Sequence, residues 1–143
     1  MHPKHDEDFY GWAMAEANLL RQRRLGDLDF DNLIEELESM GASERRALVS
    51  RMAQLIFHLL KWQFQPDFRG RSWRASIKEQ RKKTKGILKD NPSFKNEITN
   101  FISDAYEDAF LLIEKETPLD LKLFPAECPY SFEQIMNNEF YPE

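Results

Sequence analysis

The sequence has little of what disulfides, membrane spans and common cofactor sites require. Its 143 residues include one cysteine, Cys128, so an internal disulfide is impossible and a reducing, cytoplasmic compartment is expected. No uninterrupted apolar run approaches the ~20 residues that a membrane-spanning helix needs. The CxxC, HxxxH, P-loop and GxGxxG signatures are all absent. We therefore expect no membrane association, no metal and no cofactor.

The composition is that of a globular protein with few helix-breaking residues. Apolar residues make up 41% of the chain and aromatic residues 13%, too much for a disordered segment. There are five glycines and seven prolines, and the prolines cluster at expected element ends. We therefore predict an all-α fold, a compact bundle in a single helical domain that covers residues 1–143.

Apolar residues at helical spacing divide the chain into six expected helices. Four are long, whereas the second and the last are short. Gly41 is expected to end or kink the second helix. The expected N-caps of the first four helices are Asp6, Asp29, Ser43 and Ser72. The expected ranges are roughly 9–20, 30–40, 44–65, 73–89, 93–116 and 132–137, with an extended strip over 119–124.

The second and third expected helices differ in how much of their surface is apolar. The third, over 44–65, is apolar around most of its circumference, which is typical of the central helix of a small bundle. The second has one apolar face, which we expect to point inward. This face consists of Phe30, Leu33, Ile34, Leu37 and Met40.

Five segments spread over nearly the whole chain carry a family resemblance. In chain order they are DFYGW, NLIEELESMGASERRAL, HLLKWQFQP, RSWRASIKEQR and FPAECPYSFEQI. In these segments the sequence resembles the bacterial family called domain of unknown function 29. The resemblance implies an almost wholly helical, bacterial domain. It implies no activity, because the family has no settled one.

Positive charge is concentrated between Arg69 and Lys89. This segment holds nine Lys/Arg against one Glu, a net of +8, although the whole chain carries −5. It joins an Arg-rich turn, RGRSWR, to one side of the basic helix, an arrangement that can bind phosphate. The candidate anion-binding residues are Arg69, Arg71, Arg74, Lys78 and Arg81. The more ordinary alternative is neutralisation within the fold by the acidic helix over 93–116.

A polar stripe follows the central helix through His58, Lys61 and Gln65, with Trp62 at its border. Helix geometry places His58 about 150° from the centre of the apolar face. His58 therefore faces solvent, the more ordinary outcome, or a groove, where it would be the candidate general acid or base. Trp62 is placed to stack on Arg71 or Arg74.

Three carboxylates fall on or beside apolar helix faces. Glu16 lies on the apolar stripe of the first helix, so we expect an Arg or a Trp N–H to pair with it. Glu36 and Glu38 flank the inner face of the second helix and are the carboxylates available to a hydrolytic site. A di-metal carboxylate site is not expected, because the chain has no Glu-x-x-His pair.

These patterns favour binding over catalysis. We predict a non-enzymatic interaction module that binds an anionic partner, an acidic protein surface or a nucleic-acid backbone, through the basic helix and the Arg-rich turn. The alternative is a hydrolase or phosphodiester-processing enzyme that uses His58 with Glu36 or Glu38, and Arg71 and Arg74 as an anion clamp. The sequence leaves the partner, the oligomeric state and the enzymatic character open.

Overall fold

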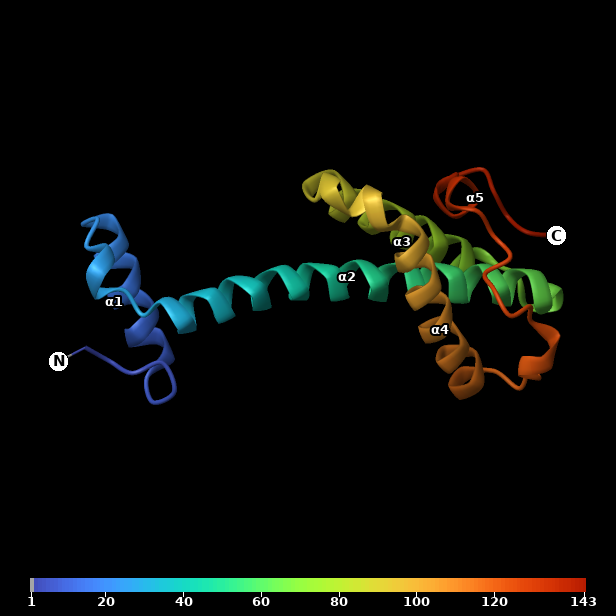
Figure 1. The fold of residues 1–143 in the computed structure, drawn as a ribbon. Coiled ribbons are helices and arrows are strands. Elements are labelled where there is room, and N and C mark those ends of the chain that lie inside the picture. Colours follow the sequence, from blue (N-terminus) through green and yellow to red (C-terminus); the bar gives the residue numbers. More distant parts are fainter. Residues whose placement is uncertain (1) are drawn as a thin grey trace. The chain divides into compact units, whose positions relative to one another are not determined.

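A computed structural model describes residues 2–143 as an all-α protein (Figure 1). Over that range no β-strand occurs, so the predicted fold class is confirmed. The long helices are α1 (Phe9–Arg21), α2 (Phe30–Phe64), α3 (Arg71–Asp90) and α4 (Ile98–Glu116), and α5 (Phe132–Met136) is short. The 3₁₀ turns are η1 (Leu25–Asp27), η2 (Pro66–Phe68), η3 (Pro92–Glu97) and η4 (Leu121–Leu123).

The chain forms two compact units. Unit 1 ends at Ser43, and unit 2 spans Glu44–Glu143. Helix α2 contributes its first part to unit 1 and its second part to unit 2. The expectation of one domain over residues 1–143 stays a prediction.

In unit 1, α1 packs against the start of α2. Asp8, not the predicted Asp6, is the N-cap of α1, and its side chain accepts a hydrogen bond from the N–H of Gly11. The indole Nε1 of buried Trp12 donates to Asp29 Oδ2 at 2.9 Å. Asp29 stands directly before α2, at the predicted helix start.

Glu16 is the buried carboxylate of unit 1, with only 1% of its surface exposed. One carboxylate oxygen accepts from the backbone N–H of Asp29. The other lies 3.0 Å from Nε2 of His2, although without hydrogen-bond geometry. The expectation of an Arg or Trp N–H partner was therefore wrong. The main chain at the start of α2 reaches the carboxylate instead, because α1 packs there.

The predicted second and third helices are one helix, α2, of 35 residues. Gly41 does not end it, and Ser43 is an interior residue rather than a cap. A glycine inside a helix costs only ~1 kcal/mol relative to alanine. Good helix formers on both sides outweigh that cost, so the helix continues through Gly41.

The apolar face of α2 in unit 1 is exposed, contrary to the expectation that it would point inward. The exposed fractions are 54% for Phe30, 51% for Ile34, 66% for Leu37 and 65% for Met40. The N-terminal segment meets another side of α2, where Nε2 of His5 lies 2.6 Å from Glu36 Oε1. Apolar spacing in the sequence identified the face but not whether anything covers it.

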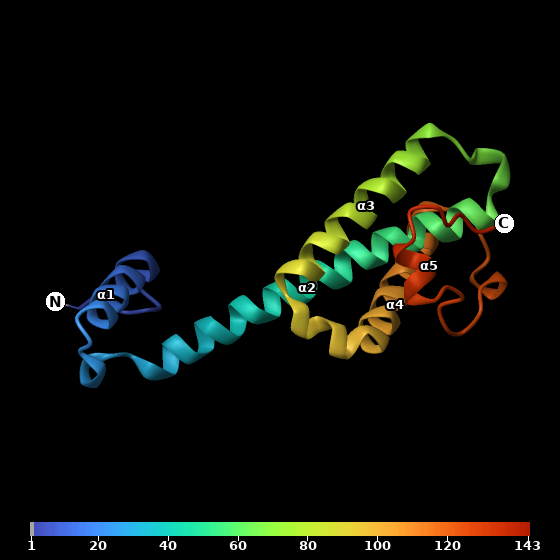
Figure 2. The same cartoon turned by 90° about the horizontal axis from the view of Figure 1, so that it is seen from above.

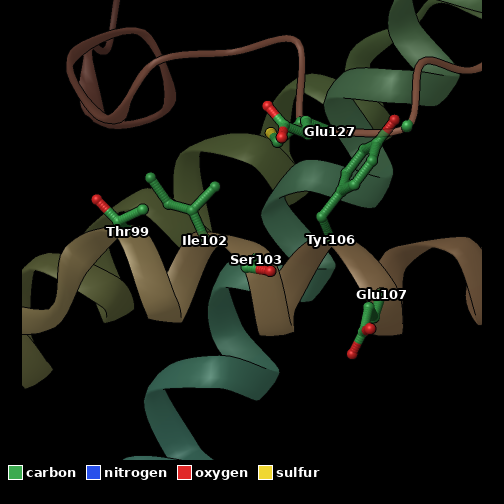
Figure 3. A pocket seen from close by; sticks show the side chains of 8 residues that line it. Thr99, Ile102, Ser103, Tyr106, Glu107 and Glu127 are labelled. Carbon is green, nitrogen blue, oxygen red and sulfur yellow. The ribbon is translucent and has the colours of Figure 1, made fainter.

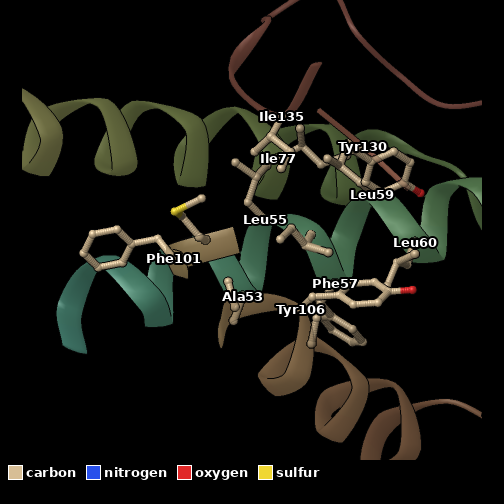
Figure 4. Close-up of a cluster of buried hydrophobic side chains, with 14 of the residues drawn as sticks. Ala53, Leu55, Phe57, Leu59, Leu60, Ile77, Phe101, Tyr106, Tyr130 and Ile135 are labelled. Carbon is tan, nitrogen blue, oxygen red and sulfur yellow. The ribbon is translucent and has the colours of Figure 1, made fainter. Parts of the chain in front are cut away.

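In unit 2, α3 runs back along the second part of α2 in the opposite direction, as both views show (Figures 1 and 2). The core lies between these helices, α4 and α5 (Figure 4). It includes Leu55 and Leu59 from α2, Ile77 from α3, Phe101 from α4 and Ile135 from α5. Nine residues of α2 are buried, which confirms that the apolar segment supplies the central helix.

The ends of the elements in unit 2 agree with the sequence in one case and differ in another. Gly70, not Ser72, is the N-cap of α3, and no side chain caps this helix. Ser131 and Gln134 form the predicted capping box of α5. The expected strip over 119–124 contains the single turn η4 and buries Phe124, whereas Leu123 remains 55% exposed.

Candidate anion-binding site

One side of α3 carries a row of exposed cations, here called the basic stripe. Its members recur at spacings of three or four residues and fall within about 80° of the helix circumference at 100° per residue. They are Arg71, Arg74, Lys78, Lys82, Lys85 and Lys89, all exposed. Ile77, Thr84 and Leu88, centred about 100° away around the helix, are buried. Burial of this apolar side therefore turns the stripe toward solvent.

Acidic residues of η3 and α4 do not form ion pairs with the basic stripe. Asp104 lies 3.3 Å from Arg45 Nη1 of α2, and Glu97 lies 4.0 Å from Arg45 Nη2. Over residues 2–143, the one ion pair involving α3 is internal, between Lys83 and Glu79 at 2.6 Å. The alternative in which the basic helix is neutralised by its acidic neighbour is therefore not supported.

Arg81, one of the candidate anion-binding residues, points inward. It is 1% exposed, and its guanidinium donates to the carbonyl oxygens of Ile135 at 2.8 Å and Phe140 at 2.7 Å. Longer bonds reach the carbonyls of Gln134 and Asn138 at 3.3 and 3.4 Å. Burial lowers the pKa of Arg81. Its donors hold the C-terminal segment, so Arg81 is not available to an external anion.

The Arg-rich turn forms an open hollow of about 490 Å³ at the start of α3, here called the Arg hollow. It is lined by Trp62, Arg69, Gly70, Arg71 and Arg74. Arg69 Nε donates to the carbonyl of Trp62 at 2.6 Å, which fixes the turn against the end of α2. The uncapped first-turn N–H groups of α3 add positive potential to this hollow.

Arg74 joins the hollow to the C-terminal segment through aromatic stacking. Its guanidinium lies 5.0 Å from the ring centroid of Trp62 and 5.4 Å from that of Tyr141. The two rings are themselves 4.9 Å apart. The predicted stacking of Trp62 on Arg74 is confirmed. Tyr141 carried no sequence signal, because it is brought to the site by Arg81 from far along the chain.

The polar stripe of α2 is half-buried rather than freely solvated. His58 Nδ1 lies 2.8 Å from the carbonyl of Gln54, and burial lowers the pKa of His58, with Lys61 adding to the effect. Lys61 Nζ lies 4.7 Å from the ring centroid of Trp73, and burial lowers the pKa of Lys61. Gln65 is half-buried where α2 ends. At neutral pH the polar stripe of α2 therefore presents the uncharged imidazole of His58 near the ammonium group of Lys61.

The carboxylates of the hydrolase alternative belong to unit 1, whereas His58 belongs to unit 2. Glu36 takes part in the pairing with His5, and Glu38 is exposed. The carboxylate that acts on the pKa of His58 is Glu116, not Glu36 or Glu38. Within unit 2, His58 does not line the Arg hollow. No observation thus assembles the predicted acid/base pair with the anion clamp.

A second cavity in unit 2, of about 340 Å³, lies between α4 and the C-terminal segment (Figure 3). Its walls include Ser103, Tyr106, Glu127 and Cys128. Tyr106 donates to the carbonyl of Pro125 at 2.7 Å, and burial raises its pKa to about 12. Burial also raises the pKa of the Cys128 thiol. Both groups therefore remain protonated at neutral pH, so neither of them is an activated nucleophile.

The described residues contain neither a cluster of metal-ligating side chains nor a helix that could span a membrane. Among residues 2–143, no three His, Cys, Asp or Glu side chains are grouped so that they could hold a metal ion. None of the helices in this range is both long and apolar enough to cross a bilayer. The Arg hollow and the basic stripe together present guanidinium, ammonium, aromatic and backbone N–H groups.

Comparison with known proteins identifies the family of this chain. No curated protein and no solved structure matches the sequence. The model of the family described as "Domain of unknown function DUF29" matches residues 5–141. Because this match covers nearly the whole sequence, the chain belongs to the DUF29 family.

Proposed function

We propose that the chain is a non-enzymatic interaction module that binds an anionic macromolecule along the basic stripe and at the Arg hollow. One observation carries the proposal: six exposed cations follow one side of α3, and none of them forms an ion pair with another described residue. Uncompensated positive charge in a chain of net charge −5 is a local binding feature rather than a general property of the surface.

The length of the basic stripe favours an extended partner. From Arg71 to Lys89 the helix rises about 27 Å, at 1.5 Å per residue. A single phosphate group would meet only one or two of these cations, whereas a nucleic-acid backbone presents phosphates along the whole row. The Arg hollow adds the guanidinium of Arg69 to those of Arg71 and Arg74 in the basic stripe. A guanidinium group can bind phosphate with two parallel hydrogen bonds. An acidic protein surface is the second partner class that fits this charge pattern.

Fluorescence anisotropy with a labelled duplex DNA and a labelled polyglutamate peptide tests the proposal. We expect the DNA affinity to fall steeply as KCl rises, since each neutralised phosphate adds about −0.9 to the slope of log K against log salt. The triple variant Arg74→Gln, Lys78→Gln, Lys82→Gln removes three stripe cations and should flatten the slope by up to about 3.

A charge-matched control separates the stripe from total charge. The variant Lys95→Gln, Lys115→Gln, Lys122→Gln removes three exposed cations that lie outside α3 and should leave the slope nearly unchanged. Tighter binding of polyglutamate than of DNA would assign the surface to an acidic protein. Failure of both probes to bind at low salt would refute the proposed function.

A further inference from the structure

Unit 1 exposes an apolar helix face that nothing in the unit covers. Four side chains of α2 form it, each more than half exposed, and we call it the α2 apolar face: Phe30, Ile34, Leu37 and Met40. Their spacing of four, three and three residues places them within about 120° of the helix circumference. Single exposed apolar residues are normal, but a contiguous row on one face is typical of an interaction site.

Exposed carboxylates border this face along one edge. Asp31, Glu35 and Glu38 are exposed and follow the apolar residues along the helix, at about 80–140° from Phe30 around the axis. Over the described residues, none of the three forms an ion pair. Between Arg24 and Arg45 the chain has no Lys or Arg. The edge is therefore a row of unneutralised negative charge.

The remainder of unit 1 strengthens the negative field. Residues 1–43 contain ten Asp/Glu against four Lys/Arg, a net of −6, whereas residues 44–143 contain fifteen against sixteen, a net of +1. The acidity of the whole chain is thus concentrated in unit 1. A helix that lies on the α2 apolar face would have one side against Phe30, Ile34 and Leu37 and its flank against the carboxylate edge.

We propose that the α2 apolar face binds an amphipathic helix of a partner protein whose apolar stripe is flanked by Lys or Arg. Apolar residues at positions i, i+4 and i+7 of α2 are the anchors that helix-on-helix recognition uses. The carboxylate edge selects basic flanks and rejects acidic ones. This proposal concerns unit 1 and does not depend on the proposed function of the basic stripe.

Charge argues against two other occupants, and burial argues against a third. In an antiparallel pair of two copies, the same edge of each helix faces the other, so Asp31, Glu35 and Glu38 would meet their own copies and repel. An anionic lipid surface is repelled by the same edge. Helix α3 of a second copy has the basic charge that would suit the carboxylate edge. Its apolar side, with Ile77 and Leu88, is however buried in its own unit and is therefore not free to pack on the α2 apolar face.

Isothermal titration calorimetry with the full chain and two synthetic helical peptides tests the proposal. Both peptides carry leucine at helical spacing; one has lysine at the flanking positions and the other has glutamate. We expect the lysine peptide to bind and the glutamate peptide not to bind. A double variant, Ile34→Ser with Leu37→Ser, removes two apolar anchors. A triple variant, Asp31→Asn with Glu35→Gln and Glu38→Gln, removes the carboxylate edge. Each variant should weaken binding of the lysine peptide by at least about tenfold.

The matched control is Tyr10→Ser, Met14→Ser, which removes two exposed apolar side chains from α1 in the same unit. This control should bind the lysine peptide as the unmodified chain does. Equal weakening by the control and by the Ile34, Leu37 variant would overturn the proposal, as would equal binding of the two peptides. Light scattering, which measures the molar mass in solution, tests whether a second copy binds instead. If the unmodified chain is a dimer and the Ile34, Leu37 variant is a monomer, the face binds a second copy and the partner helix is refuted.

Discussion

The buried guanidinium of Arg81 gives the sharpest prediction about stability. Replacement of Arg81 by methionine keeps an unbranched, largely apolar stem, although a shorter one, and removes every donor to the C-terminal segment. The two short bonds, to Ile135 at 2.8 Å and to Phe140 at 2.7 Å, are charge-assisted, and each contributes about 1.5–3 kcal/mol. Because water can reach part of the freed segment, we expect a loss of about 3–5 kcal/mol in the free energy of unfolding.

Urea denaturation followed by tryptophan fluorescence measures this loss, and hydrogen exchange locates it. Amides of α5 should lose protection first, because Arg81 donates to the carbonyls of Gln134 and Ile135. Arg81→Lys should recover only part of the loss, since an ammonium cannot reproduce the planar fork that reaches several carbonyls at once.

Lys82→Met is the control for the loss of one charge from α3. Lys82 is exposed and adjacent, so its replacement should change the free energy of unfolding by less than about 0.5 kcal/mol. A loss below about 1 kcal/mol for Arg81→Met, with α5 still protected from exchange, would show that the carbonyl contacts contribute little. In that case the burial of Arg81 would not be what positions Tyr141 beside the Arg hollow.

Two further predictions concern unit 1 and the middle of α2. The hydrogen bond to Glu36, with that to Asp6, raises the pKa of His5 above its ordinary value of 6.5, so the protonated ring stabilises the folded unit. That stabilisation is complete below pH 6.5 and is lost as pH rises through the folded-state pKa of His5. Over this pH range the free energy of unfolding in urea should decline less for His5→Gln than for the unmodified chain. Parallel plots of unfolding free energy against pH for the two proteins would refute the pairing. Gly41→Ala should stabilise the chain by about 0.5–1 kcal/mol in the same assay, because a Cβ at this helix-interior position meets no atom within 4 Å. Gly11→Ala is its counterpart and should destabilise, since a Cβ there would collide with the Asp8 cap; equal effects of the two substitutions would contradict the structure.

Local patterns predicted the helices well where short-range energetics decide them. The apolar segment 44–65 is the buried part of α2, and Ser131 with Gln134 forms a capping box, because both features depend on residues within one or two helical turns. Gly41 and Ser43 were misread as a boundary. A helix break is settled by the balance over many residues, and one glycine and one serine were too weak to tip it.

The candidate site was predicted in part, for a similar reason. Helical spacing placed Arg74 and Lys78 on one side of α3 together with Arg81, but only the packing of the neighbouring side of α3 against the C-terminal segment decides which of these cations are exposed. Arg81 lies at the boundary and points inward. The approach of Tyr141 to Trp62 links residues far apart in the sequence, and no local pattern announces it.

The sequence by itself determined the all-α class, the family, the central apolar helix and the concentration of positive charge after Pro66, since these follow from composition, spacing and ordered segments. Tertiary structure alone decided which charged and apolar faces remain uncovered. Burial is a property of what packs against a face, and for Arg81 and Leu37 the packing was the opposite of what spacing suggested. The basic stripe and the α2 apolar face therefore became visible as surfaces only in the folded chain.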